Sequence, residues 1–102
     1  MKDENLNQAI IAYLGKAGSA AYPGKDEVAV IAVAAKADSN PVELLAKVRA
    51  IDTEFMAIEI DWSSNTLEEG GDEAKRVMAS RYPNLDEDAL EALRWKFTYD
   101  LR

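Results

Sequence analysis

The stretch from Asn40 to Trp62 restricts the possible folds of this chain more than any other part of the sequence. Asn40, Pro41 and Glu43 match a capping box with proline at the first helical position, so we expect a helix to begin at Pro41. The apolar residues that follow recur at alternating spacings of four and three, namely Leu44, Val48, Ile51, Phe55, Ile58 and Trp62. This stripe predicts one long helix from residue 41 to about residue 62.

A second interpretation breaks this helix near Asp52 and makes residues 56–62 a strand, because apolar and polar residues alternate there. Residues 27–36 are apolar all round, which is compatible with a buried central helix or a buried strand. The four β-branched residues between positions 28 and 33 favour a strand, whereas the alanines and a capping Asp26 favour a helix. Two such strands would form a two-stranded parallel sheet, which is scarcely found without further strands. We therefore favour helices.

The remaining segments also have helical patterns. Residues 3–17 place Leu6, Ile10 and Leu14 on one face, with Asn7 elsewhere on the helical wheel. Residues 63–71 are predicted to be a loop, since the glycines at positions 70 and 71 would end any short helical turn that Thr66 caps. Helices are expected over residues 72–81 and 86–101, and Asp86 is the expected cap of the second of them. The prediction is an all-α fold, a small bundle of about five helices forming one domain over residues 1–102; the alternative is an α/β or α+β fold with strands near 28–33 and 56–62.

The composition limits the chemistry of the chain, which has neither cysteine nor histidine. Disulfides, thiolate nucleophiles, histidine general bases and histidine metal ligands are therefore excluded. The sequence has no glycine-rich phosphate loop, and most of its acids lie where helices are expected to begin. We expect no enzyme, no cofactor and no metal; an enzyme built on carboxylates is a lower alternative.

The charge is strongly negative, with 12 basic and 19 acidic residues and a net charge of −7. Residues 39–71 carry seven acids and two bases, which is most of the excess. An acidic surface repels phosphates, so nucleic acid and anionic membranes are not expected partners, and basic proteins are. No signal peptide and no apolar run of about 20 residues is present, so we expect a soluble, cytoplasmic protein.

The last predicted helix carries apolar residues on two sides. Trp95 and Tyr99 lie nearly opposite Leu90 and Phe97 on the helical wheel, so they are candidates for contact with another molecule, with Arg94 at the rim. Glu54, Glu59 and Asp61 lie off the long apolar stripe and are expected to face water. Our hypothesis is a non-enzymatic protein of regulatory, inhibitor or immunity type that acts through protein–protein contacts; the alternative is a structural homo-oligomer, such as a homodimer. The candidate protein-binding residues are Trp95, Tyr99, Arg94, Glu54, Glu59 and Asp61.

Overall fold

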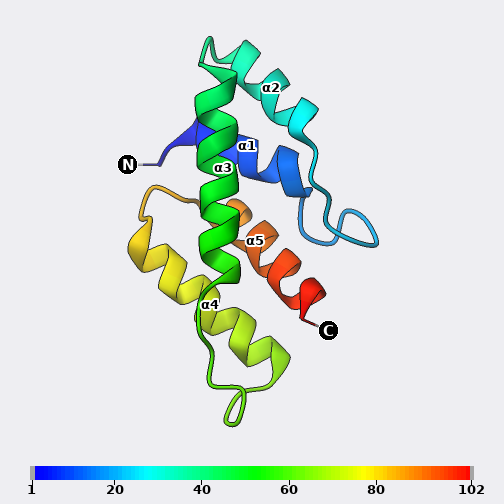
Figure 1. The fold of residues 1–102 in the computed structure, drawn as a ribbon, viewed down its shortest axis with the longest axis vertical. Coiled ribbons are helices and arrows are strands. Elements are labelled where there is room, and N and C mark those ends of the chain that lie inside the picture. The colour runs from blue at the N-terminus through cyan, green and yellow to red at the C-terminus, as the bar shows by residue number, and fades with distance from the viewer. Residues whose placement is uncertain (1, 102) are drawn as a thin grey trace.

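The computed structural model describes residues 2–101, which form five α-helices and no strand (Figure 1). The helices are α1 (Glu4–Leu14), α2 (Glu27–Lys36), α3 (Pro41–Met56), α4 (Leu67–Arg81) and α5 (Glu87–Asp100). The prediction of a small all-α bundle is confirmed, and the strands considered near residues 28–33 and 56–62 do not form. None of the helices within residues 2–101 combines the length and the apolar character that crossing a bilayer requires.

Helix α3 runs along much of the long dimension of the molecule, which measures 45 × 30 × 18 Å (Figure 1). Helix α2 lies at one end, and within the described chain it contacts only α1 and α3. Helices α4 and α5 pack together towards the other end, and α1 bridges the two parts because it contacts α5 as well as α2 and α3. The bundle therefore has an α2 end and an end formed by the α3–α4 connection.

Every helix begins with a side chain that accepts a hydrogen bond from a free backbone amide of the first turn. Asp3, Asp26, Asn40, Thr66 and Asp86 occupy these positions. Such caps stabilise a helix by about 1 kcal/mol each. The predicted caps Asp26, Asn40 and Asp86 are thus confirmed, although Asn40 accepts from the amides of Val42 and Glu43 and the return bond of a full capping box is absent from the described contacts.

The core lies where α1, α3, α4 and α5 meet. Phe55 of α3 and Phe97 of α5 are almost fully buried and pack edge to face, with ring centroids 5.5 Å apart. Burial of one such ring contributes about 1.5–3 kcal/mol. Residues of the predicted stripe, Leu44, Val48 and Ile51, continue this core towards the α2 end. The apolar stripe therefore faces the core as expected up to Ile58, whereas its last residue, Trp62, is 45% exposed.

The predicted length of the third helix is wrong, because α3 ends at Met56 and not near Trp62. Residues 57–66 form a connection without helix or strand. The Asp61 carboxylate accepts hydrogen bonds from the Ser63 amide, at 3.1 Å, and from the hydroxyls of Ser63 and Ser64. These local bonds compete with helical ones and favour a turn. Ile58 still reaches the core from this irregular segment.

Two further helix boundaries differ from the prediction. Helix α4 begins at Leu67 and not at residue 72, because Thr66 and Glu69 form a complete capping box and the two glycines lie inside the helix. Helix α1 ends at Leu14 and not at residue 17, because Gly15 adopts a φ of 96° and a ψ of 157°, a conformation that favours glycine and does not continue the helix.

The expectation that residues 27–36 are buried on all sides is also wrong. They form a helix, but only Val30 and Ala34 are buried. The reason is its position at one end of the bundle, where it is covered on one side by α1 and α3.

Candidate protein-binding surface

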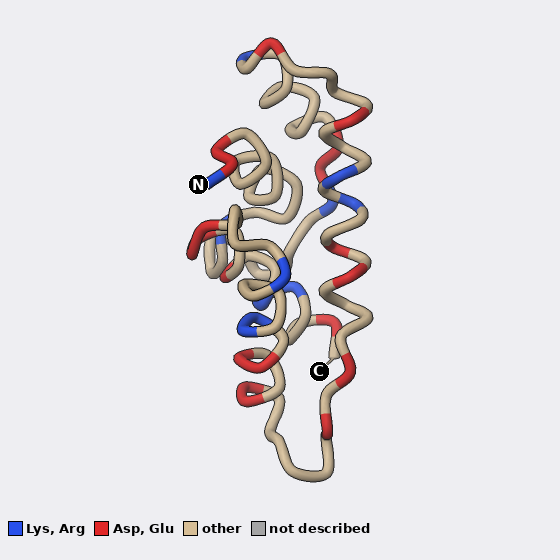
Figure 2. The backbone as a smooth tube through the Cα atoms, turned by 90° about the vertical axis from the view of Figure 1, so that its left-hand side faces the viewer, with Lys and Arg blue, Asp and Glu red and all other residues tan. Residues whose placement is uncertain are grey.

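The end of the molecule opposite α2 is strongly acidic. Residues 50–74 contain eight acids and no lysine or arginine. Figure 2 shows acidic segments on both arms of the chain at this end, the arm leaving α3 and the arm entering α4. The exposed acids between residues 57 and 73 are Glu59, Asp61, Glu68, Glu69 and Asp72. We call these five acids, together with the residues between them, the acidic end. The acidic excess that the sequence places in its middle third is therefore gathered in space.

Asp61 shapes the turn at the tip of the acidic end. Its carboxylate accepts the hydroxyl protons of Ser63 and Ser64, and its backbone carbonyl accepts from the Asn65 side chain at 2.9 Å. The hydrogen bonds from Ser63 and Ser64 hold the pKa of Asp61 below its ordinary value, because they stabilise the charged carboxylate. Asp61 therefore links Ser63, Ser64 and Asn65 through its carboxylate and its backbone carbonyl.

Trp62 lies on the acidic end and connects its two arms. Its indole ring covers Gly70 so closely that a Cβ atom there would collide with the ring. The ring also stacks on Phe97, with centroids 6.3 Å apart and planes 23° apart. Even so, 45% of Trp62 is exposed. An exposed tryptophan fixed on one side by packing is the type of residue that forms a binding hot spot.

Arg94 binds acidic groups of α4 within the chain. Its guanidinium donates to the Asp72 carboxylate and to the Glu68 carboxylate, both at 2.8 Å, and to the Glu68 carbonyl at 3.1 Å. Only 17% of its side chain is exposed. Burial lowers the pKa of Arg94, but the bonds with Glu68 and Asp72 outweigh that effect and raise it. Arg94 thus joins α5 to α4 and neutralises part of the acidic end.

Glu54 lies beside the acidic end, where α3 meets the end of α4. Its carboxylate accepts from the Tyr82 hydroxyl at 2.7 Å and from the Arg81 guanidinium at 3.1 Å. The hydrogen bond from Tyr82, together with that from Arg81, lowers the pKa of Glu54. The same contact raises the pKa of Tyr82, since its proton stabilises the carboxylate. Glu54 is therefore an internal link between two helices.

Trp95 and Tyr99 lie on another side of the molecule, against the α1–α2 loop. A Cβ atom on Gly15 would lie 3.4 Å from the Trp95 ring, so the loop covers part of this half-buried side chain. Tyr99 is 41% exposed, and its ring centroid is 6.4 Å from that of Tyr22. The chain itself thus supplies part of the partner surface for these two aromatic rings.

The six candidate residues therefore do not form one site. Glu59 and Asp61 belong to the acidic end, whereas Glu54 and Arg94 bind neighbouring helices and Trp95 with Tyr99 faces the α1–α2 loop. Sequence reasoning missed Trp62 as an exposed residue, because its spacing matched the core stripe. It also missed the exposed face of α2, because a helix that is apolar all round is typical of a buried one.

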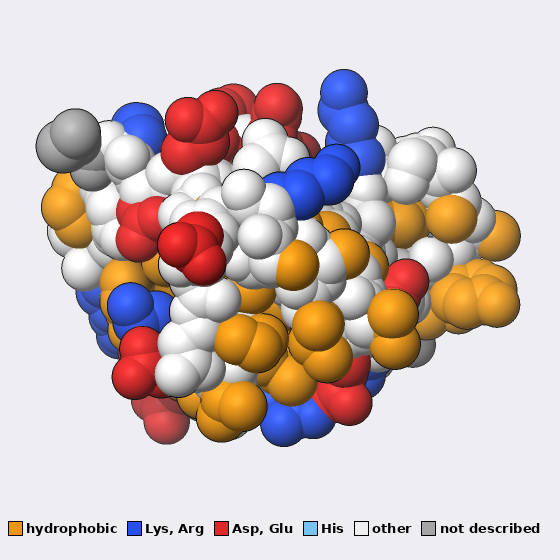
Figure 3. Space-filling model, turned by 90° about the horizontal axis from the view of Figure 1, so that it is seen from above, with side chains coloured by type: hydrophobic (Ala, Val, Ile, Leu, Met, Phe, Trp, Pro, Cys, Tyr) orange, Lys and Arg blue, Asp and Glu red, His pale blue; other side chains and the backbone are white. Residues whose placement is uncertain are grey.

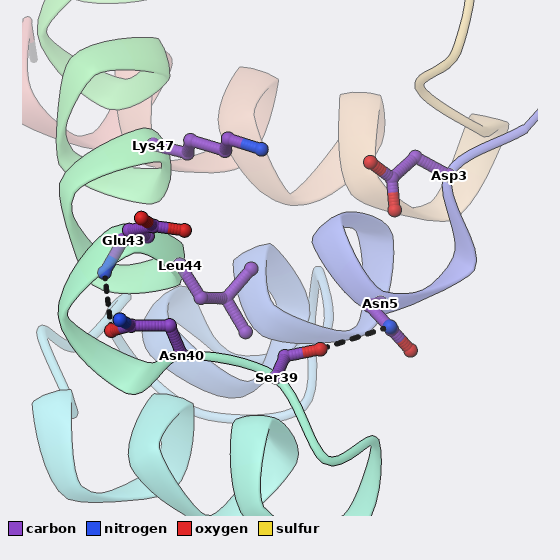
Figure 4. A pocket seen from close by; sticks show the side chains of 7 residues that line it. All are labelled: Asp3, Asn5, Ser39, Asn40, Glu43, Leu44 and Lys47. Carbon is purple, nitrogen blue, oxygen red and sulfur yellow. Dashed lines mark hydrogen bonds between the residues drawn. The ribbon is translucent and has the colours of Figure 1, made fainter.

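A polar pocket of about 320 Å³ lies between the start of α1 and the α2–α3 corner (Figure 4). Its side chains mostly have structural roles: Asp3 and Asn40 cap helices, and Asn5 contacts Ser39 at 3.5 Å. Lys47 extends from α3 across the pocket in Figure 4. Within residues 2–101, no three carboxylates converge as they would around a metal ion.

Comparison with known proteins adds no family to these observations. A scan against family models and searches of curated proteins and of solved structures found no match to this chain.

Proposed function

We propose that this chain is a non-enzymatic binding protein of regulatory, inhibitor or immunity type, and that its acidic end docks a basic protein partner. The observation that carries the proposal is the concentration of acids at one end of the molecule, around the exposed Trp62. A surface of one sign attracts a partner of the opposite sign and speeds their encounter.

The ion pairs within the acidic end leave part of this charge available. Arg94 neutralises one charge of the pair Glu68 and Asp72, and Arg76 pairs with Glu73. Glu59 and Glu69 form no ion pair with the described residues. A basic partner can therefore pair with these carboxylates while an apolar side chain packs on Trp62, the arrangement typical of an interface with a central anchor and a polar rim.

The experiment uses the wild-type chain and two charge reversals as baits in an extract of the source cells. Glu59→Lys changes the charge of the acidic end by two, and Glu43→Lys makes the same change on an exposed residue at the start of α3. We expect a basic protein to be retained by the wild type and by Glu43→Lys, and its affinity for Glu59→Lys to fall about tenfold. Baits that recover no protein but themselves, or three baits that retain the same protein equally, would refute the proposal.

A further inference from the structure

Helix α2 presents a continuous apolar face to the outside of the bundle. Eight of its ten residues are apolar, yet only Val30 and Ala34 are buried. The opposite side consists of Val28, Ile31, Ala32 and Ala35, all exposed, with 75% of Val28 and 47% of Ile31 accessible. Their spacing of three, one and three residues places them on one face of the helix. We call these four residues the α2 face.

The α2 face is part of a larger hydrophobic band. Seen from the α2 end, hydrophobic side chains extend across the surface (Figure 3). Contiguous apolar surface of this kind on a protein with a net charge of −7 marks an interaction site.

The charge distribution indicates which molecule covers this band. The residues next to the α2 face nearly balance in charge, since Lys25 and Lys36 stand against Asp26, Glu27 and Asp38. A strongly basic partner would therefore prefer the acidic end of the molecule. The α2 face is suited to bind an uncharged, apolar face of another helix, and α2 of a second copy of this chain provides such a face.

We propose that the α2 face is a homodimer interface, in which α2 packs antiparallel against α2 of a second copy. Helical geometry makes the face self-complementary in this arrangement. Val28 and Ala35 lie within about 20° of each other around the helix axis, on the midline of the face. A twofold axis between Ile31 and Ala32 then sets each Val28 against Ala35 of the second copy. A large side chain meets a small one in each pair, so the two helices can approach closely.

Electrostatics favours the same arrangement. Antiparallel packing brings the positive end of each helix dipole next to the negative end of the other. It also places the Lys36 end of each α2 beside the Glu27 end of the second copy, whereas parallel packing would bring like charges together. Glu27 already pairs with Arg49 of its own chain, so the dipoles and Lys36 supply most of this attraction.

The dimer also keeps the acidic ends apart. The molecule is 45 Å long, and its acids gather at the end opposite α2 (Figures 1 and 2). A dimer joined through α2 therefore separates the two acidic ends by far more than the Debye length of about 8 Å at physiological salt. Self-association through this helix avoids the repulsion that the net charge would otherwise cause.

The first test is sedimentation equilibrium from about 5 to about 500 μM protein, because one exposed helix face is a small interface that predicts micromolar affinity. Ala32→Glu places a charge in the α2 face, and Ala79→Glu makes the same change on an exposed position of α4, which does not contact α2. We expect the mass of the wild type and of Ala79→Glu to rise from 11.3 kDa towards twice that value. The dissociation constant of Ala32→Glu should increase at least about tenfold. A wild type that stays monomeric, or an Ala32→Glu variant that dimerises normally, overturns the proposal.

The second test determines the direction of packing, and it is simple because the chain has no cysteine. Ala32→Cys lies next to the proposed twofold axis and should form a disulfide-linked dimer on oxidation. Val28→Cys should crosslink only when it is mixed with Ala35→Cys. Val28→Cys that crosslinks efficiently with itself would overturn the antiparallel arrangement.

The α2 face and the acidic end lie at opposite ends of the molecule, so their roles can be rejected separately. A monomeric chain that still binds a basic partner rejects only the dimer. A dimer without a partner rejects only the proposed function.

Discussion

Replacing Asn7 by alanine should destabilise the protein far more than its polar character suggests. Asn7 is fully buried. Its amide nitrogen donates to the Asn84 carbonyl at 3.0 Å, and its amide oxygen accepts from the Asp86 N–H at 2.9 Å. It therefore fixes the turn between α4 and α5 to α1, across almost the whole length of the sequence.

The magnitude follows from what each partner loses. The Asn84 carbonyl retains the Asp3 N–H, at 3.0 Å, so that loss is one ordinary hydrogen bond of about 1 kcal/mol. The Asp86 N–H has only Asn7 as its hydrogen-bond partner among the described residues, and leaving it unpaired costs about 1–3 kcal/mol. The expected loss is about 3 kcal/mol, a large fraction of the 5–15 kcal/mol that is usual for a domain.

Urea unfolding followed by circular dichroism measures this loss. With a slope of about 1–3 kcal/mol per molar urea, Asn7→Ala should lower the midpoint by roughly 1–3 M. Asn5→Ala is the matched control on the same helix. Asn5 is exposed, and among the described residues its side chain has only the 3.5 Å hydrogen bond with Ser39, so the loss should stay below about 0.5 kcal/mol. Equal losses in the two variants would refute the reasoning.

Three further predictions concern α3, α4 and α5. Gly70→Ala should lower the thermal midpoint and alter tryptophan fluorescence, because the added Cβ displaces Trp62. The same substitution elsewhere inside a helix normally stabilises the protein by about 1 kcal/mol. An unchanged or higher midpoint would therefore contradict this contact. The lowered pKa of Glu54 means that its contribution to stability is present at neutral pH and is lost as the pH falls below about 4.3. Glu54→Gln should therefore reduce the acid sensitivity of the urea midpoint. Identical pH profiles for the variant and the wild type would exclude this role. Lys96→Met should cost about 3–5 kcal/mol in urea unfolding, because it leaves the buried Asp52 carboxylate, 3.3 Å from the Lys96 ammonium, without its partner; a variant as stable as the wild type would show that the pair is dispensable.

The sequence predicted the existence of the helices better than their ends. The caps Asp26, Asn40 and Asp86 could be predicted because capping depends on local chemistry. The end of α3 could not, because the apolar spacing continues past it: Ile58 and Trp62 pack on the bundle from an irregular segment. Periodicity reports which side of the chain is buried, and a loop that follows the core can continue the spacing of a helix.

Tertiary contacts explain the other errors. Glycine disfavours a helix in isolation, but at residues 70 and 71 it permits the close approach of Trp62 and Thr98, and the start of α4 includes both positions. Asn7 lies on the buried side of α1 because its partners are backbone groups nearly eighty residues away. The local sequence pattern shows neither the close approach at residues 70 and 71 nor the distant partners of Asn7.

The candidate site was predictable only in its charge. The sequence places the acids in the middle of the chain, and the fold gathers them at one end. The sequence could not show that Arg94 binds Glu68 and Asp72, since that pairing depends on how α5 lies against α4. It could not show that α2 is peripheral either, because an apolar segment looks the same at the centre of a large core and at the edge of a small one.

The contacts between the start of α1 and the α4–α5 turn have a consequence for how the chain reaches its native state. Lys2 donates to the carbonyls of Pro83 and Leu85, alongside the bonds of Asn7, so these contacts join residues about eighty positions apart. Contacts at such separation carry the largest loop-closure entropy and slow folding. During synthesis, α1 has no native partner for these groups until residues 83–86 have been made. Helix α1 can therefore pack on α2 and α3 early, whereas its polar contacts with the α4–α5 turn form only after every helix except α5 has been made.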